Sequence, residues 1–482
     1  MGATVIINDL NRASDWSAVR VTVLGLGIAG YACADSLIFL GAQTTALDER
    51  DTPGLREKKE LLEVLGGTVI LGQELHLPAD TQLLVVSPGL APTHPVITQA
   101  QLAGVPVWGE LELAWRLRDL DAPAAWLCVT GTNGKTTTTL MLESMLRAAG
   151  LRTTAGGNIG RSMVEVVMDP EGYDVIAVEV GAPQLPFTFS MSPFAAVCLN
   201  LAEDHIDHFG SMDQYAAAKA RVFENTQVAA IYNVDDPATI TMVENADVIE
   251  GCRAVGFTLQ TPSLSELGLV EDILVDRAFI ENRQSHAQEL CTVEDVQPAA
   301  RHNVANALAA AALARAFGIE PAFVRQGLHD FQPAAHRVAF VATIDDVKYI
   351  NDSKATNCHA AQTALKSYDK VVWIAGGDAK NQNFDDLVKS TKDRMRAVVL
   401  LGRDRALVKS ALEKHAPDVP VVEVADTDPA AMLEVVSLAR GLAQAGDVVL
   451  LAPACASWDM YQNYGHRGDM FADAVRQLGG EQ

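Results

Sequence analysis

The sequence predicts an α/β protein of three domains, and three observations support this. Glycine-rich loops at residues 25–30 and 131–134 each follow a short apolar run and precede a segment of helical character. Four further apolar runs between residues 348 and 452 are each followed by a polar loop, as in a parallel sheet with helical crossovers. The length of 482 residues suits about three domains of ~150 residues each.

The first domain is predicted over residues 1–121. A strand at 20–24 enters the loop Gly25-Leu26-Gly27-Ile28-Ala29-Gly30, a helix follows over 31–40, and a second strand at 43–47 leads to Asp48. This G-x-G-x-x-G spacing, with an acid after the second strand, is typical of a Rossmann-like domain. The glycines indicate an anion-friendly helix start but not which phosphate compound binds there. A nicotinamide dinucleotide, a nucleotide sugar and an empty domain therefore all stay open.

The central domain, residues 122–333, is predicted to open with a strand at 126–130 that enters the loop Gly131-Thr132-Asn133-Gly134-Lys135-Thr136. The glycines let backbone N–H groups turn inward, Lys135 adds a cation, and Thr136 adds a hydroxyl suited to Mg²⁺. The standard pattern needs a glycine where this chain has Val129, so the loop is a shortened variant. Its setting between a strand and a predicted helix at 140–146 favours a nucleotide site over an ordinary turn.

Ionisable residues follow two further strands of this domain. A strand at 174–178 ends at Glu179, and a strand at 195–201 is followed by a crowded group that includes His205 and His208. Strand-end carboxylates near a phosphate loop suit Mg²⁺, although many are only solvated. We expect His205 to be functional and His208 to face the loop. Lys219 lies in a predicted helix, where composition alone indicates a surface lysine.

The remaining segments give weaker indications. A glycine-rich turn is predicted over 154–160, and its Asn158 could reach a ligand. Residues 260–300 are acidic and predict a small antiparallel piece. An alanine-rich helix after Arg301 places Asn303 and Asn306 on one face, which fits either nucleotide contact or helix capping. The last domain, residues 334–482, is predicted as another α/β sheet with polar loops at the carboxyl ends of its strands.

Composition excludes several classes of partner. The formal net charge of −24 disfavours nucleic acid and anionic membranes. The seven cysteines are scattered without a C-x-x-C pair, which is typical of reduced, mostly buried thiols in an intracellular protein. We see neither a signal peptide nor an apolar run of membrane-spanning length, so we expect a cytoplasmic protein.

Together these motifs resemble the Mur ligase family over nearly the whole chain. The resemblance rests on Gly131–Thr136, Gly157–Gly160, Asn200–Asp207, Lys219, Arg301–Asn306 and His336-Arg337. Two later stretches, Asn351–Asn357 and Pro453–Asp459 with Arg467-Gly468, resemble the members that add D-glutamate. The resemblance implies a Rossmann-like N-terminal domain holding a uridine nucleotide, a central P-loop ATPase-like domain with a mainly parallel sheet, and a C-terminal Rossmann-like α/β domain.

The resemblance also implies a reaction in peptidoglycan precursor synthesis. ATP phosphorylates the carboxylate of UDP-N-acetylmuramoyl-L-alanine, the amine of D-glutamate attacks the acyl phosphate, and phosphate leaves as the amide forms. The implied cofactors are ATP, Mg²⁺ at two sites and a carbamylated lysine at Lys219. The partners would be these small molecules, without nucleic acid or membrane insertion, and we expect a monomer.

The residue roles that the resemblance implies fall into five groups. The catalytic residues would be Lys135, Glu179, His205, Lys219 and Lys354. Mg²⁺ would be held by Thr136, Glu179, His205 and Lys219. ATP would contact Gly131, Thr132, Asn133, Gly134, Lys135, Thr136, Thr137, Asn303, Arg337 and Asp352. The UDP-substrate would be surrounded by Leu26, Ile28, Ala29, Asp48, Glu49, Arg50, Gly89, Asn158 and His205. D-Glutamate would contact His336, Lys354, Thr356, Ser457, Trp458 and Tyr464, with Asp378 and Lys380 as weaker matches.

One stretch departs from the family pattern. The family usually shows Glu-x-Ser-Ser-x-Gln-Leu after the metal-binding strand, whereas this chain has Glu179-Val180-Gly181-Ala182-Pro183-Gln184-Leu185. Two hydroxyl donors are therefore missing near the acceptor carboxylate. Three alternatives stay open: another amide ligase of the superfamily, such as one that polyglutamylates folate, a nucleotide-binding partner subunit without turnover, and a nicotinamide dehydrogenase.

Overall fold

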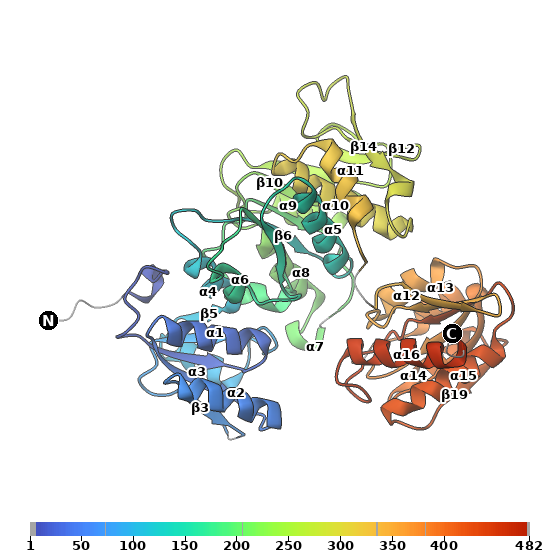
Figure 1. The fold of residues 1–482 in the computed structure, drawn as a ribbon, viewed down its shortest axis with the longest axis horizontal. Coiled ribbons are helices and arrows are strands. Elements are labelled where there is room, and N and C mark those ends of the chain that lie inside the picture. Colours follow the sequence, from blue (N-terminus) through green and yellow to red (C-terminus); the bar gives the residue numbers. More distant parts are fainter. Residues whose placement is uncertain (1–5, 73, 205, 334–335, 381, 480–482) are drawn as a thin grey trace. The chain divides into compact units, whose positions relative to one another are not determined.

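The computed structural model describes residues 6–72, 74–204, 206–333, 336–380 and 382–479. The chain forms two compact units. The first runs to Leu201 and resumes after Asp204 to end at Phe331; it is coloured from blue to yellow in Figure 1. The second comprises Ala202–Asp204 and the chain from Gln332 onward. Within the described ranges, no helix combines the length and the apolar character needed to cross a membrane.

The first unit begins with a five-stranded parallel sheet in the order β3-β2-β1-β4-β5. The strands are β1 (Arg20–Leu24), β2 (Gln43–Asp48), β3 (Thr68–Leu71), β4 (Leu83–Val86) and β5 (Val107–Gly109). The helices are α1 (Ile28–Phe39), α2 (Pro53–Val64), α3 (Pro95–Leu102) and α4 (Glu110–Leu117). In β4, Leu83 and Val85 enter one apolar core while Leu84 and Val86 enter another, because successive side chains point to opposite faces. Both faces of this sheet are therefore covered.

A nine-stranded sheet follows in the order β14-β13-β12-β11-β10-β9-β6-β8-β7. Its strands are β6 (Ala125–Thr130), β7 (Thr153–Gly157), β8 (Val175–Glu179), β9 (Ala195–Cys198), β10 (Ala229–Asn233), β11 (Arg253–Phe257), β12 (Glu266–Val270), β13 (Ile273–Asp276) and β14 (Gln288–Thr292). Only the pairs β12–β13 and β13–β14 are antiparallel among these described strands. The small antiparallel piece expected between residues 260 and 300 is confirmed.

The helices of this part are α5 (Lys135–Ala148), α6 (Met163–Val167), α7 (Ile206–Phe209), α8 (Met212–Ala220), α9 (Pro237–Glu244), α10 (Arg301–Ala316) and α11 (Pro321–Asp330). Helix α5 begins at Lys135, five residues before the segment predicted from sequence. The run of threonines lowers intrinsic helix propensity, yet Thr136, Thr138 and Thr139 are all buried in the folded protein. Packing in the folded protein, and not the intrinsic propensity of threonine, therefore decides that α5 begins at Lys135.

The stretch predicted as a glycine-rich turn at 154–160 is in part a strand. Residues Thr153–Gly157 form β7, which pairs in parallel with β8 at the edge of the sheet. The chain turns only after β7, and Gly157 at the end of the strand and Gly160 in the turn have positive φ angles of 100° and 58°. The prediction of a turn over the whole stretch was wrong because glycine weakens a strand signal without preventing edge pairing.

The two sheets of the first unit share one apolar core. Trp115 of α4 packs edge-to-face against Trp126 of β6, with ring centroids 5.1 Å apart. Side chains from α1, β1, β6 and β8 belong to the same buried cluster. Helix α4 therefore fastens the N-terminal sheet to the central one.

The second unit contains a six-stranded sheet in the order β15-β16-β20-β17-β18-β19, parallel except for the β15–β16 hairpin. Its strands are β15 (Ala339–Ile344), β16 (Val347–Asn351), β17 (Val371–Ala375), β18 (Met395–Leu400), β19 (Val421–Glu423) and β20 (Val448–Leu451). Its helices are α12 (Cys358–Lys366), α13 (Asp385–Thr391), α14 (Arg405–His415), α15 (Met432–Leu442) and α16 (Tyr464–Gly479). Val448 and Leu450 face one core, and Val449 and Leu451 face the other. The predicted α/β sheet is confirmed.

Candidate active site

The loop between β6 and α5 has the shape of a phosphate-binding turn. Gly131 and Gly134 have φ angles of 149° and 86°, and a Cβ at Gly134 would lie 2.4 Å from the side-chain oxygen of Asn306. Lys135, Thr136 and Thr137 form the first turn of α5. The loop therefore leads into the positive end of a helix dipole.

Asn200, just after β9, fixes the conformation of this loop. The N–H of Thr132 donates to the Asn200 carbonyl at 3.0 Å, and the N–H of Asn133 donates to the Asn200 side-chain oxygen at 2.9 Å. The Asn200 amide in turn donates to the Asn133 carbonyl at 3.1 Å. Sequence reasoning assigned no role to Asn200, although its place at the end of a strand next to β6 was a usable signal.

Two lysine side chains meet at this loop. The ammonium of Lys135 donates to the carbonyls of Gly131 and Thr132 at 2.9 and 2.8 Å. Lys219 donates to the same Gly131 carbonyl at 2.7 Å, and its ammonium lies 4.7 Å from the ring centre of Tyr215. Lys219 is only 1% exposed, so the interpretation of it as a surface lysine is wrong. Lys135 therefore brings to this glycine loop a cation of the kind that a polyphosphate requires, and the buried Lys219 lies beside the same carbonyl.

Glu179 forms hydrogen bonds with Thr136 and Asn158, two residues that the sequence alone could not bring together. It ends β8 and is buried. Its Oε2 accepts from the hydroxyl of Thr136 at 2.6 Å, and its Oε1 accepts from the amide of Asn158 at 2.8 Å. Hydroxyl and carboxylate oxygens are the ligands that Mg²⁺ prefers. Among the described residues no group of three His, Cys, Asp or Glu is placed to hold a metal, and His205 lies outside those residues.

The departure at Gly181 has a local consequence. The N–H of Gly181 donates to Oε1 of Gln184 at 2.7 Å. A Cβ at this position would lie 3.2 Å from the side-chain oxygen of Asn158, which is tighter than usual van der Waals contact. Glycine here therefore leaves room for the Asn158 amide that contacts Glu179.

The amides predicted to share one helix face do so. Asn303 and Asn306 are both buried in α10, and the Asn306 amide lies 3.4 Å from the Asn303 side-chain oxygen. Asn303 also donates to the Pro298 carbonyl at 3.2 Å. Because Asn306 faces Gly134, it is Asn306 that contacts the phosphate loop, while Asn303 lies one turn earlier on the helix.

The N-terminal glycine loop is held by Asp48, which ends β2. Asp48 accepts a hydrogen bond from the Leu26 N–H at 2.8 Å. The Arg50 guanidinium donates two further hydrogen bonds to the Asp48 carboxylate, each at 3.0 Å. Burial raises the pKa of Asp48, but the bonds from Arg50 and Leu26 outweigh it and bring this pKa below its usual value. Glu49 contacts His94 at 3.1 Å. Ile28 and Ala29 begin α1 and Gly89 follows β4, so these residues occupy one edge of the sheet.

In the second unit, Arg467 joins two loops. Strands β16 and β20 are neighbours, so the loops 351–357 and 453–459 leave the same sheet edge. The Arg467 guanidinium donates to the Ser353 hydroxyl at 3.0 Å, the Ser353 carbonyl at 2.8 Å and the Cys455 carbonyl at 3.1 Å. Burial lowers the pKa of Arg467 to about 10. Sequence reasoning noted Arg467-Gly468 as a motif but gave it no role.

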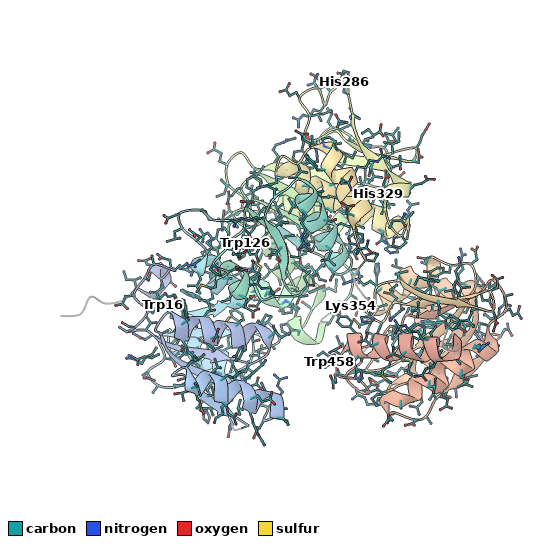
Figure 2. All side chains as sticks on the ribbon, viewed as in Figure 1. Trp16, Trp126, His286, His329, Lys354 and Trp458 are labelled. Atoms are coloured by element: carbon teal, nitrogen blue, oxygen red, sulfur yellow. The ribbon has the colours of Figure 1, made fainter. Side chains whose placement is uncertain are left out.

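Five of the residues predicted for D-glutamate lie on these loops or on α16, namely Lys354, Thr356, Ser457, Trp458 and Tyr464. The Lys354 ammonium lies 3.9 Å from the ring centre of Tyr464. Ser457 is buried and Thr356 is half-buried, whereas Trp458 is 71% exposed. Figure 2 labels Lys354 and Trp458 at the same side of the second unit. The structure therefore brings a half-buried cation, an aromatic ring and hydroxyl groups to one part of this unit.

His336 and Asp352 adjoin the same loops. Nδ1 of His336 lies 3.0 Å from the Asn351 amide, and a Cβ at Gly468 would lie 2.2 Å from that ring nitrogen. Burial raises the pKa of Asp352 to about 6, opposed by the nearby Arg337 guanidinium and the Val338 N–H. The weaker matches lie on the loop after β17, where Asp378 pairs with Arg403 at 3.1 Å and Lys380 has a positive φ of 48°.

Comparison with known proteins places these features in one family. Sequence profiles match for the Mur ligase MurD-like N-terminal domain at residues 19–109, the Mur ligase middle domain at 129–314 and the Mur ligase glutamate ligase domain at 336–455. The UDP-N-acetylmuramoylalanine--D-glutamate ligases of Streptomyces coelicolor and Thermobifida fusca are 56% and 52% identical to this chain. They align over 97% and 96% of it, and over 99% of their own lengths.

Solved structures share the fold at lower identity. A UDP-N-acetylmuramate-alanine ligase from Thermotoga maritima superposes with a TM-score of 0.56 at 20% identity, over 95% of this chain and 99% of its own. A pseudomurein peptide ligase type C from Methanothermus fervidus superposes with a TM-score of 0.58 at 16% identity, over 95% of this chain and 100% of its own.

Proposed function

Because the chain belongs to the Mur ligase family, we propose that it is an ATP-dependent ligase that joins D-glutamate to UDP-N-acetylmuramoyl-L-alanine in peptidoglycan precursor synthesis. Full-length relatives with that activity in their names share more than half of the residues. The structural observation that carries the proposal is the glycine loop at 131–134, with Lys135 and Lys219 at one carbonyl and Thr136 bonded to Glu179.

The chemistry explains why such a loop is needed. A carboxylate is a poor acyl donor, so it must first take the γ-phosphoryl group of ATP. Both partners of that step are anions and repel each other. Lys135 would neutralise the phosphates, and the N-terminal end of α5 would add its dipole. Loss of phosphate from the acyl phosphate then drives formation of the amide bond with the amine of D-glutamate.

Thr136 and Glu179 fit a magnesium ion. Their oxygens lie 2.6 Å apart at the start of α5 and the end of β8, and both are hard ligands. In such a site Mg²⁺ neutralises phosphate oxygens during phosphoryl transfer. Asn158 would keep Glu179 in position through its 2.8 Å bond. His205 belongs to the same proposal but lies outside the described residues.

Lys219 is proposed as a carbamylated residue. Burial disfavours an ammonium, and reaction of the neutral amine with CO₂ would replace the cation with an anion able to support Mg²⁺. Support comes from its 1% exposure and from its place beside Gly131 and Tyr215. Intact mass of the protein prepared with ¹³C-bicarbonate, compared with Lys219→Arg, tests this modification separately from turnover.

The other two substrates are assigned by the loops that suit them. We propose the uridine nucleotide at the edge of the first sheet, around Leu26, Ile28, Ala29, Asp48, Glu49, Arg50 and Gly89. We propose D-glutamate at the loops of the second unit, where Lys354, Thr356 and Ser457 supply a cation and hydroxyl donors for its two carboxylates.

Phosphate release tests the proposal directly. The assay contains ATP, Mg²⁺ and UDP-N-acetylmuramoyl-L-alanine, and compares D-glutamate with L-glutamate, L-alanine and meso-diaminopimelate. We expect release only with D-glutamate, and a loss of at least a hundredfold in Lys135→Ala, because a charge-assisted contact that strengthens in the transition state is removed. The exposed Lys392→Ala serves as the matched control and should keep wild-type activity.

Other outcomes would point elsewhere. Release with a different amino acid would favour another amide ligase of the superfamily. No release with any amino acid, despite measurable ATP binding, would favour the nucleotide-binding partner subunit.

A further inference from the structure

We propose that Lys58 positions the glycine loop Gly25–Gly30 and supplies positive charge to the anionic part of the nucleotide bound there. No sequence motif includes this residue. The inference rests on the proposed uridine-nucleotide site and adds a binding determinant from a different element, helix α2.

Lys58 reaches from α2 to the loop that follows β1. Its ammonium donates to the carbonyl oxygens of Leu26 at 3.0 Å and Gly27 at 3.2 Å. It also lies 5.4 Å from the ring centre of Tyr31, in the first turns of α1. One side chain therefore contacts both the loop and the helix whose N-terminal end faces the proposed nucleotide.

The loop itself is tightly constrained. A Cβ at Gly30 would lie 1.7 Å from the Gly25 carbonyl oxygen, so α1 packs directly on the loop. Asp48 holds the Leu26 N–H at 2.8 Å. The backbone of this loop is thus hydrogen-bonded by two side chains. Asp48 accepts from the Leu26 N–H, and Lys58 donates to the carbonyls of Leu26 and Gly27. Without Lys58, two carbonyl dipoles would present negative charge close to an anion site.

The charges around Lys58 also favour an anion. Burial lowers the pKa of Lys58, the nearby Arg50 guanidinium lowers this pKa further, and Asp48 opposes both effects. Asp48 is already engaged by both nitrogens of the Arg50 fork. The adjoining acids Glu49 and Asp51 contact His94 and Arg56. In a chain with a net charge of −24, two cations beside one carboxylate at this loop are an exception that a diphosphate would match.

Binding of UDP and of uridine to the full-length protein distinguishes this role from a structural one. We expect Lys58→Met to weaken UDP about tenfold or more by calorimetry, since a charge-assisted contribution is lost, and to change uridine less than threefold. The slope of log Kd for UDP against log salt concentration should become shallower. Lys58→Arg should recover part of the affinity. In the ligase assay, KM for the UDP-substrate should rise while kcat stays within twofold.

Lys59→Met is the matched control, because Lys59 is the next residue of α2 and pairs with Glu63 at 3.6 Å. It should bind UDP as the wild type does. Equal weakening of UDP and uridine in Lys58→Met would overturn the charge role, and unchanged UDP affinity would overturn the whole inference. If the wild-type protein turns over D-glutamate and Lys58→Met binds UDP as well as the wild type, this inference alone is refuted. Wild-type protein without turnover refutes the proposed function instead.

Discussion

At the scale of single residues, Glu110 shows how burial can outweigh hydrogen bonding. Its Oε1 accepts from the N–H groups of Met163 and Val164 at 2.5 and 3.2 Å, and its Oε2 accepts from Gln184 at 3.3 Å. These donors favour the carboxylate, yet burial raises the pKa of Glu110 to about 7, with a smaller contribution from Glu165. Glu110 therefore titrates where α4 of the N-terminal sheet meets α6.

Glu110 should make stability depend on pH. Its pKa is raised on folding, so between about pH 4.5 and 7 the folded state holds a proton that the unfolded state has lost. Stability must then fall as pH rises through this window, by on the order of 3 to 4 kcal/mol at about 1.4 kcal/mol per pKa unit. We expect Glu110→Gln to flatten this part of the profile of thermal midpoint between pH 5 and 8.

The exposed Glu57→Gln is the control for this experiment and should follow the wild-type profile. Other titrating groups contribute equally to both proteins, so the difference between variant and wild type reports Glu110. A difference that does not change with pH would show that Glu110 stays ionised.

At the scale of elements, helix α5 is bounded by two glycines with the same backbone geometry and different surroundings. Gly134 has a φ of 86° and Gly150 a φ of 80°. A Cβ at Gly134 would lie 2.4 Å from Asn306, whereas no atom lies within 4 Å of a Cβ at Gly150. Gly134 is thus required both for its positive φ and because Asn306 leaves no room for a Cβ, whereas Gly150 is required for its positive φ alone.

Alanine substitutions at Gly134 and Gly150 therefore distinguish the cost of a left-handed backbone from the cost of a steric clash. We expect Gly150→Ala to lower stability by about 1 kcal/mol and leave ATP affinity unchanged, because only the left-handed conformation is penalised. We expect Gly134→Ala to weaken ATP at least tenfold as well, because Asn306 and the loop must move. Fluorescent-ATP titration together with thermal melting measures both effects. Equal ATP affinity in the two variants would contradict the role given to Gly134.

At the scale of the whole molecule, the apolar cores follow the two units. One buried cluster extends from the N-terminal sheet into the central sheet, and a second lies on the other face of the central sheet. Two more clusters cover the two faces of the sheet in the second unit. Side chains of the N-terminal sheet and of the central sheet therefore belong to one apolar core.

Unfolding should reflect this division of the cores. Hydrogen exchange in increasing urea should show the amides of β1 and β6 opening together, and those of β17 and β20 opening at a different urea concentration. UDP should raise protection in the first unit only, because the proposed nucleotide residues lie there. Separate opening of β1 and β6 would contradict the shared core, and one transition for the whole chain would contradict two independent units.

The sequence alone determined the elements whose signals are local. Apolar runs such as those at residues 20–24 and 126–130 predicted buried strands, and glycine loops at 25–30 and 131–134 predicted where strands turn into helices. These patterns act through neighbouring residues, so they are legible without tertiary contacts. The helix start at Lys135 and the strand Thr153–Gly157 were missed because sheet pairing and packing outweigh the weak propensities of threonine and glycine.

Only the tertiary structure decided which predicted residues meet. Thr136 and Glu179 bond across 43 positions, Lys219 and Gly131 across 88, and Arg467 and Ser353 across 114. Burial of Lys219 and the reach of Lys58 to Leu26 have no local signal either. Such contacts arise from the order in which parallel strands bring their carboxyl ends to one edge, and strand order is a property of long-range pairing.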